Sequence, residues 1–313
     1  MKKFLLILLV LLILFLSFAY IFIPNEVKIS SVSLSSSIPK NIIDCLHDSS
    51  VIRRWWPAKL PQSLTDSINY GNYNYSLKEN FMDGAVLQLE SEDENFLIKV
   101  RVVAKGKDSS AAEIGTSFNV GSNPFKRIGR YYKAFNLKND LRRILVSLLD
   151  FARATENIYG FHIERTTFTD TILYATKFSS KTNPSTQMIY DHINELKNKI
   201  RDSGAIEKDY PMLNVKQKDS SDYEIMIAIC VNREIGRYKN YFPSRMVNMK
   251  DRFLKTIVLG GLSMVESAHQ AIDRYMDDRS LSQPGIPFDI LVTDRSKEVD
   301  TTKWRTIIFY PSM

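Results

Sequence analysis

Two similar runs of strand and helix patterns follow each other in the second half of the chain, and this repeat constrains the fold more than any other feature. The first run reads as a strand, a helix and two further strands over residues 170–178, 185–204, 211–215 and 223–231. The second run has the same order over residues 253–261, 263–278, 287–293 and 304–311. Pro287 follows Pro211 by 76 residues, so the pattern predicts two strand-helix-strand-strand units in tandem.

Each of the two helices carries a single apolar stripe, which it cannot bury alone. The stripes consist of Met188, Ile189, Ile193, Leu196 and Ile200 in the first helix and Met264, Val265, Ala268, Ile272 and Tyr275 in the second. Both stripes become buried if the helices pack side by side on one joint antiparallel sheet. The duplication then predicts a pseudo-twofold axis with a cleft between the halves, which is a favoured place for a small ligand.

Three segments of this region resemble the gyrase-inhibitor-like family, also known as AraC-type effector-binding domains. They are Gly260-Gly261 before the second helix, the strand PFDILVTD over residues 287–294 and the closing segment KWRTIIFYP over residues 303–311. The resemblance covers residues 158–313. It implies a domain that binds small, often cationic or amphipathic molecules between its halves, with aromatic side chains and a buried carboxylate. Some members are ligand-sensing parts of transcription regulators, some bind gyrase and some are hydrolases.

Asp289 interrupts an apolar strand and is the central candidate site residue. Alternation places Phe288, Ile290 and Val292 on one face of this strand and Asp289, Leu291 and Thr293 on the other. One interpretation is a pocket carboxylate, whose desolvation a bound cation would offset. The other is a solvated strand aspartate without a function.

The candidate ligand-binding residues are Asp289, Leu291, Trp304, Tyr174 and Tyr223. Aromatic faces attract cations, although core packing is the alternative for each of these rings. The resembled family commonly has Glu and Tyr at the positions of Asp289 and Leu291, and an acidic residue at that of Ile307. These differences weaken a cation site.

The region before the repeat predicts a separate domain over residues 27–155. Strand patterns cover residues 26–34, 72–81, 84–91, 96–106 and 111–120, with a short helix at 38–48 and a long one from 124 to 154. The opening strand, Trp55-Trp56-Pro57 and the helix after Pro124-Phe125 resemble the SRPBCC superfamily, which is also called START-like, helix-grip or polyketide-cyclase-like. That resemblance implies a curved sheet around a long helix, often with an apolar cavity. Trp55 and Trp56 are interpreted as either a core plug or ligand contacts.

The N-terminal segment contains an uncharged run of 20 residues from Phe4 to Ile23. At about 1.5 Å per residue it is long enough to cross a hydrocarbon core of roughly 30 Å. We expect residues 1–24 to form an uncleaved anchor, with a cleaved signal peptide as the alternative. Lys2 and Lys3 predict a cytoplasmic N-terminus with both domains exported, in the periplasm if the source is bacterial.

Charge, histidines and cysteines exclude several function classes. The net charge is +7, and residues 126–143 are basic with interleaved aromatics, which we interpret as a solvated helix face without nucleic acid as a partner. The four scattered histidines, His47, His162, His192 and His269, show no metal-binding spacing, and we expect no metal and no cofactor. Cys45 and Cys230 fall in different predicted domains, which argues against a disulfide.

The sequence therefore predicts an α+β, single-pass membrane protein whose exported domains bind a small hydrophobic or cationic amphipathic molecule. A cyclase or hydrolase acting on a small hydrophobic substrate is one alternative, and an envelope interaction module without a small ligand is another. The pattern contains no Ser-His-Asp or Cys-His arrangement, and Asp289 is its single candidate for a general base. We assign no catalytic residue.

Overall fold

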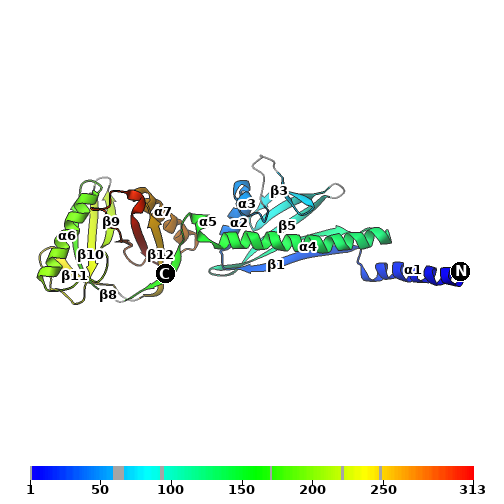
Figure 1. The fold of residues 1–313 in the computed structure, drawn as a ribbon, viewed down its shortest axis with the longest axis horizontal. Helices are drawn as coiled ribbons and strands as arrows, with labels where there is room; N and C mark the ends of the chain where they lie inside the picture. Colours follow the sequence, from blue (N-terminus) through cyan, green and yellow to red (C-terminus); the bar gives the residue numbers. More distant parts are fainter. Residues whose placement is uncertain (1, 59–66, 92–94, 170, 220–221, 247–248) are drawn as a thin grey trace. The chain divides into compact units, whose positions relative to one another are not determined.

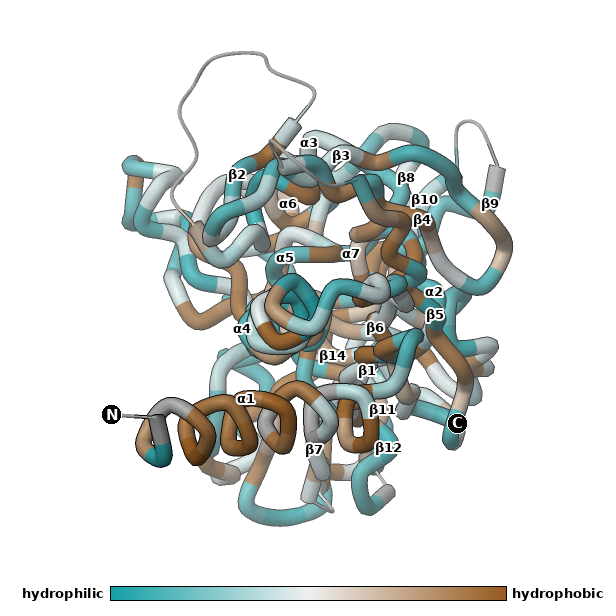
Figure 2. The backbone as a smooth tube through the Cα atoms, turned by 90° about the vertical axis from the view of Figure 1, so that its right-hand side faces the viewer, coloured by the Kyte–Doolittle hydropathy of each residue, from teal (hydrophilic) through white to brown (hydrophobic). Residues whose placement is uncertain are grey.

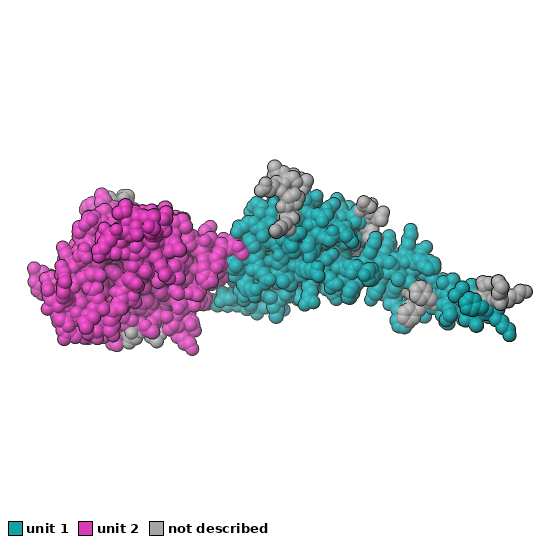
Figure 3. All heavy atoms as spheres, in the orientation of Figure 1, with its two compact units in different colours: residues 1–154 teal, residues 155–313 magenta. Residues whose placement is uncertain are grey.

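The computed structural model describes residues 2–58, 67–91, 95–169, 171–219, 222–246 and 249–313. The chain divides into two compact units, residues 1–154 and 155–313, which Figure 3 draws in different colours. Asp170, with which the first predicted strand of the repeat begins, lies outside the described residues.

Helix α1 (Lys2–Phe22) precedes the first sheet. It is hydrophobic along most of its length in Figure 2, and many of its apolar side chains are exposed. No helix among the described residues is long and apolar enough to cross a membrane, so the spanning segment expected over residues 4–23 is not supported.

The first unit contains a six-stranded antiparallel sheet in the order β1-β6-β5-β4-β3-β2. Its elements are β1 (Glu26–Ser35), α2 (Pro39–His47), α3 (Ser49–Trp55), β2 (Ile68–Tyr70), β3 (Tyr73–Phe81), β4 (Gly84–Glu90), β5 (Asn95–Gly106), β6 (Ser109–Asn119) and α4 (Pro124–Arg153). The predicted order of strand, short helix, meander and long helix is confirmed. Helix α3, which Asp48 caps through a hydrogen bond from the Ser50 backbone N–H, was not predicted.

Helix α4 begins where the Asn123 side chain accepts hydrogen bonds from two backbone N–H groups of the first turn. Its apolar stripe, which includes Leu141, Ile144 and Leu148, is buried, and the helix contacts β1 and β6. Trp55 and Trp56 are both buried, and Trp55 Nε1 donates a hydrogen bond to the Cys45 carbonyl at 2.9 Å. Their interpretation as a core plug is therefore confirmed.

The second unit contains an eight-stranded antiparallel sheet in the order β11-β8-β10-β9-β13-β14-β12-β7. Figure 1 shows α6 and α7, the longer helices of this unit, beside its strands. Its elements are α5 (Thr155–Tyr159), β7 (Glu164–Phe168), β8 (Thr171–Ser180), α6 (Thr186–Asp202), β9 (Met212–Asp219), β10 (Asp222–Cys230), β11 (Tyr241–Met246), β12 (Met249–Leu259), α7 (Leu262–Asp278), β13 (Phe288–Leu291), the short 3₁₀ helix η1 (Thr301–Lys303) and β14 (Arg305–Pro311).

The predicted duplication is confirmed as β8-α6-β9-β10 followed by β12-α7-β13-β14. The two halves share one sheet, as expected, and they meet where β13 pairs with β9. Leu213 and Asp289 are hydrogen-bonded strand partners there, and they also occupy equivalent positions in the two repeats. The pseudo-twofold axis therefore passes through this residue pair.

Two strands that the sequence did not predict, β7 and β11, curl the sheet. Strand β7 pairs with β12 at one end of the strand order, while the next strand along the chain, β8, lies near the other end. Residues Phe168 and Thr171 end and begin these strands, and this step of chain spans at most about 11 Å. In a flat sheet the six strand spacings between β8 and β7 would separate these strands by roughly 29 Å. The sheet must therefore curve into a half-barrel that brings its ends together.

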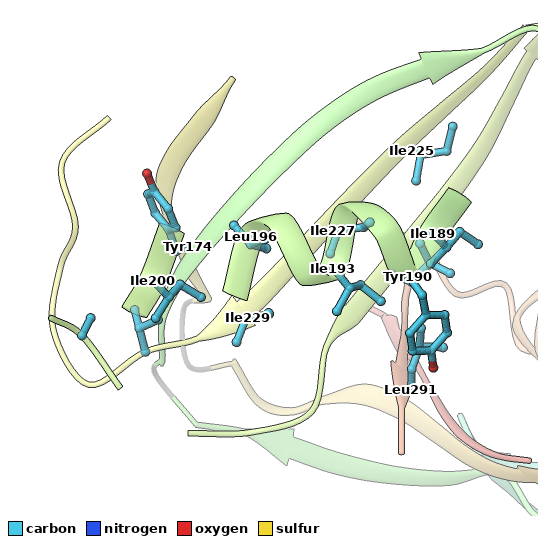
Figure 4. Close-up of a cluster of buried hydrophobic side chains, with 13 residues drawn as sticks. Tyr174, Ile189, Tyr190, Ile193, Leu196, Ile200, Ile225, Ile227, Ile229 and Leu291 are labelled. Atoms are coloured by element: carbon cyan, nitrogen blue, oxygen red, sulfur yellow. The ribbon is translucent and has the colours of Figure 1, made fainter. Parts of the chain in front are cut away.

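The described residues of the second unit form three apolar clusters in its core. Figure 4 shows the first, in which Ile193, Leu196 and Ile200 of α6 face the isoleucines of β10. A second cluster lies under α7. The third combines residues from the end strands and the middle strands of the sheet, including Phe253 and Phe288, and it fills the inner side of the half-barrel. The two helices therefore cover the outer face of the sheet.

The link from β12 to α7 depends on Gly260. Its φ of 137° lies in a region that side chains other than glycine rarely adopt, and a Cβ there would lie 2.9 Å from Met264 Cγ. The sharp turn places the first residue of α7, Leu262, at a cavity between α6 and α7.

Candidate functional site

A cavity of about 530 Å³ lies in the second unit between the N-terminal halves of α6 and α7. Helix α6 contacts β8 and β10, whereas α7 contacts β12 and β14. The central strands β9 and β13 are therefore left between the helices, and they form the floor of the cavity. Its walls come from both repeats, as the predicted cleft required.

Apolar side chains line much of this cavity. Ile189 and Val265 come from the two helices, and Leu213, Val215 and Leu291 come from the floor strands. Figure 4 shows Leu291 next to Tyr190 of α6, whose ring also lines the cavity. A volume of this size is in the range of pockets that enclose small organic molecules.

Asp289 lies on the cavity face of β13, together with Leu291. Phe288 and Ile290 belong to the apolar cluster on the inner side of the half-barrel, so the side chains of β13 alternate as the sequence indicated. The Asp289 side chain is only 15% exposed. It is thus a pocket carboxylate and not a solvated strand residue.

The partner of Asp289 is His269 of α7. His269 Nε2 lies 3.3 Å from Asp289 Oδ2 in a hydrogen bond and 3.1 Å from Oδ1. The second distance is the shorter one, but its geometry is unfavourable, and Oδ1 accepts no hydrogen bond from any described residue. Asp289 is therefore paired with an imidazole and retains one free acceptor oxygen.

The other imidazole nitrogen is also engaged. His269 Nδ1 lies 2.8 Å from Tyr310 Oη, and Tyr310 forms a further hydrogen bond with Asp273. If the Tyr310 hydroxyl donates its proton to Asp273, Nδ1 has to donate to the Tyr310 oxygen. The complete network is therefore satisfied by a doubly protonated, cationic His269.

The electrostatic environment of His269 favours the same state. Burial lowers the pKa of His269, but the hydrogen bond and negative charge of Asp289, together with the charge of Asp273, outweigh it and raise the pKa above its usual value. Burial, followed by the charges of Asp273 and Asp289, raises the pKa of Tyr310. The protonated form of His269 is thus favoured beside Asp289, and the Tyr310 hydroxyl holds its proton more tightly than a free phenol does.

Arg295 is a second buried cation of the cavity lining, and it is 8% exposed. Its Nη2 donates a hydrogen bond to Thr306 Oγ1 at 2.6 Å, and its guanidinium carbon lies 5.0 Å from the centre of the Trp304 ring. Tyr190 Oη holds the Arg295 backbone by accepting from its N–H at 2.9 Å. Burial lowers the pKa of Arg295, against the raising effects of Tyr190 and Asp289.

The residues selected from the sequence are only partly brought together. Asp289, Leu291 and Tyr223 line the cavity. Tyr174 and Trp304 do not: Tyr174 is buried in the cluster under α6, and Trp304 Nε1 donates a hydrogen bond to the Glu298 carbonyl at 2.9 Å. Trp304 is therefore a packing residue, and the Arg295 guanidinium lies over its ring.

Sequence reasoning missed His269, Tyr310 and Arg295 as site residues. One signal was available for His269, which stands between Val265 and Ile272 at the spacing of the apolar stripe of α7. A polar residue on a buried stripe needs a partner. Nothing in the sequence indicated that Asp289 would be that partner.

A smaller cavity of about 230 Å³ lies on the inner side of the half-barrel. It is lined mainly by apolar residues, among them Met212, Met226, Met246 and Phe253. Arg245 also lines it. This second cavity provides a control position in the experiments below.

The described residues offer no metal centre and no reactive thiol. No group of three histidine, cysteine or acidic side chains in this part of the chain could hold a metal ion. Cys45 and Cys230 are buried and unpaired, and burial raises their pKa values to about 12 and about 11.

No protein-family model matches the chain, and no curated protein sequence does. Among solved structures it is similar to the EcmrR C-terminal domain, with 12% identity, a TM-score of 0.43 and coverage of 49% of this chain and 98% of that one. It is also similar to a hydrolase from Listeria innocua, with 9% identity, a TM-score of 0.36 and coverage of 48% and 91%. A bacterial transcription regulation protein from Staphylococcus aureus MU50 has 13% identity, a TM-score of 0.32 and coverage of 49% and 99%.

Proposed function

We propose that the second unit binds a small amphipathic molecule in the cavity between α6 and α7. The observation that carries this proposal is the cavity itself, because both repeats supply apolar walls while one repeat supplies buried ionisable groups. Apolar walls with a few convergent polar groups are typical of small-molecule sites. The effector-binding resemblance of residues 287–294 and 303–311 supports the same function.

The first unit is not part of this proposal. Its space near the short helices is filled by Trp55 and Trp56, whose ring centres lie 5.4 Å apart, and by Tyr75, which packs on Trp56 at 5.3 Å. A START-like ligand would have to displace these rings.

The proposal is tested by the thermal stability of the full chain with three probes of one shape: naphthalenemethanol, naphthaleneacetate and naphthylmethylammonium. A bound ligand stabilises the folded state by about 2.7 kcal/mol when its concentration is a hundred times its dissociation constant. We expect at least one probe to raise the melting temperature of the natural chain.

Two matched variants locate the site. Val215→Trp narrows the cavity between the helices, and Met226→Trp narrows the second cavity on the inner side of the half-barrel. We expect the shift to disappear in the first variant and to persist in the second. The reverse pattern would move the site to the inner cavity, and no shift with any probe would reject the function.

A hydrolase or cyclase is the enzymatic alternative, and the pairing of His269 with Asp289 is the observation in its favour. A general base must have a lone pair free to accept a proton from water or substrate. Asp289 engages His269 Nε2 and Tyr310 engages Nδ1, so neither ring nitrogen is free. Oδ1 of Asp289 is free to accept, but Asp289 is paired with His269, and the described lining of the cavity contains no serine or cysteine nucleophile. Binding without turnover is therefore the better-supported function, and the appearance of product from an ester probe such as naphthyl acetate would overturn that choice.

Membrane attachment and export are proposals that rest on the sequence of residues 4–23, and the described helices give them no support. A reporter fused after Met313 tests them. Activity of a reporter that functions only in the cytoplasm would reject the exported orientation, and recovery in the soluble fraction would reject attachment.

A further inference from the structure

We propose that the cavity between α6 and α7 selects an apolar molecule with a carboxylate head, and that Arg295 is the residue that binds this head. The inference rests on the proposed function and names its ligand class. It runs against the cationic ligand implied by the family resemblance, because the charges around the cavity are arranged differently.

Arg295 is a buried cation that forms no direct ion pair with a described carboxylate, and the charge of Asp289 acts on it only from beyond ion-pair distance. It is 8% exposed and lines the cavity. Its Nε donates no hydrogen bond to any residue of the described chain. Burying a guanidinium is costly unless an anion offsets the lost hydration.

The contacts that Arg295 does make hold it in place without neutralising it. Thr306 Oγ1 accepts from Nη2, and the Trp304 ring lies against the guanidinium. A hydroxyl is neutral, and an aromatic face offsets only part of the desolvation of a cation. The planar guanidinium is therefore oriented and has no described anion in direct contact, and it matches a carboxylate in shape as well as in charge.

Asp289 is less suited to bind a ligand cation than Arg295 is to bind a ligand anion. His269 Nε2 lies 3.1 Å from its Oδ1 and 3.3 Å from its Oδ2, and the network through Tyr310 favours the imidazolium. A ligand cation would have to approach both this imidazolium and Arg295. The free acceptor oxygen of Asp289 can take a neutral hydroxyl or amide donor without that repulsion.

The remaining lining fits the apolar part of such a ligand. Ile189, Leu213, Val215, Val265 and Leu291 surround the floor of the cavity. Glu266, which also lines the cavity, is exposed at its edge. A carboxylate at Arg295 with a hydrocarbon body along these side chains therefore uses both the buried cation and the apolar lining of the site.

Isothermal titration of the full chain with the three naphthalene probes tests the inference, because the probes share one naphthylmethyl body and differ in the head group, which is neutral, anionic or cationic. We expect naphthaleneacetate to bind at least about tenfold more tightly than naphthalenemethanol and naphthylmethylammonium, as a charge-assisted pair with a buried arginine provides. Arg295→Gln should remove this preference while the alcohol still binds. Arg295→Lys should keep part of it, because it retains the charge and loses the fork geometry.

Two further variants show whether a lost preference is due to Arg295 itself or to a misfolded chain. Thr306→Val removes the hydroxyl that accepts from Arg295 and leaves the guanidinium, so the preference for the carboxylate should persist or increase. Arg245→Gln removes an arginine of the second cavity and should leave the preference unchanged.

The outcomes separate the inference from the function on which it rests. If the alcohol or the ammonium probe binds as tightly as the carboxylate, or if the preference survives Arg295→Gln, the cavity binds ligands and the inference is wrong. If none of the three probes binds, both the proposed function and the inference are wrong.

Discussion

The first repeat carries Ile193 and Leu213 at the positions where the second repeat, 76 residues later, carries His269 and Asp289. In the first repeat this pair belongs to the apolar cluster under α6. In the second repeat it is an ion pair at the edge of the cavity. Both pairs lie between a helix and a floor strand, at positions that the pseudo-twofold axis relates. The same two positions are therefore apolar in the first repeat and ionisable in the second.

The comparison shows how a duplicated fold acquires an asymmetric site. The polar pair of the second repeat places ionisable groups at the cavity, and Arg295, which follows β13, adds a cation from the same repeat. The shared fold therefore supplies the shape of the site, and the differences between the repeats supply its recognition chemistry.

The largest expected effect is that of Ile193→Ala in the first repeat. Ile193 is 1% exposed, and deleting a buried isoleucine side chain costs about 4 kcal/mol through lost burial and a residual cavity. Urea unfolding of the full chain measures this change. A loss below about 1 kcal/mol would show that the apolar pair is not a core element, which would break the comparison.

The next effect is that of His269→Ile, which places the residue of the first repeat into the second. It leaves Asp289 largely buried without its imidazole, and we expect a loss of about 3 kcal/mol, at the low end for buried pairs because both side chains keep some exposure. The double variant His269→Ile with Asp289→Leu should recover most of the loss. If the two single changes are simply additive, the residues are not coupled.

The pH dependence of stability is expected to be smaller and to have a defined sign. The pKa of His269 is raised in the folded state, so its contribution is fully present below the unfolded value of about 6.5 and is lost as the pH rises through the folded pKa. Asp289, Asp273 and Tyr310 are the titratable groups that face the ring. As the pH is raised from acidic to alkaline, the free energy of unfolding should fall in the natural chain. It should fall less in the His269→Ile, Asp289→Leu double variant.

The smallest effect is expected for an ion pair on the surface of the first repeat. Lys181 Nζ lies 2.7 Å from Asp222 Oδ1, with side chains that are 83% and 38% exposed. Lys181→Ala should change the unfolding free energy by less than about 0.5 kcal/mol, because water and salt screen exposed pairs. A loss as large as that of His269→Ile would show that burial does not distinguish the two pairs.

Much of the fold could be predicted from the sequence because its signals are local. The stripes of α6 and α7 and the alternation along β13 depend on residues a few positions apart, and they gave the correct faces for Ile193 and for Asp289. Strand β7 was missed because its sequence, Glu164 to Phe168, is mostly polar and has no apolar alternation. It is a strand because β12, about 90 residues away along the chain, offers its backbone groups as partners.

The sequence by itself determined the duplication, the α+β class and the alternation that sets Asp289 and Phe288 on opposite faces of their strand. Only the tertiary structure decided that the sheet curls into a half-barrel, that Trp304 supports Arg295 instead of lining the cavity, and that His269 meets Asp289. These features join residues that the chain separates by many positions. The angle at which each helix packs on the curved sheet brings them together, and no local pattern encodes that angle.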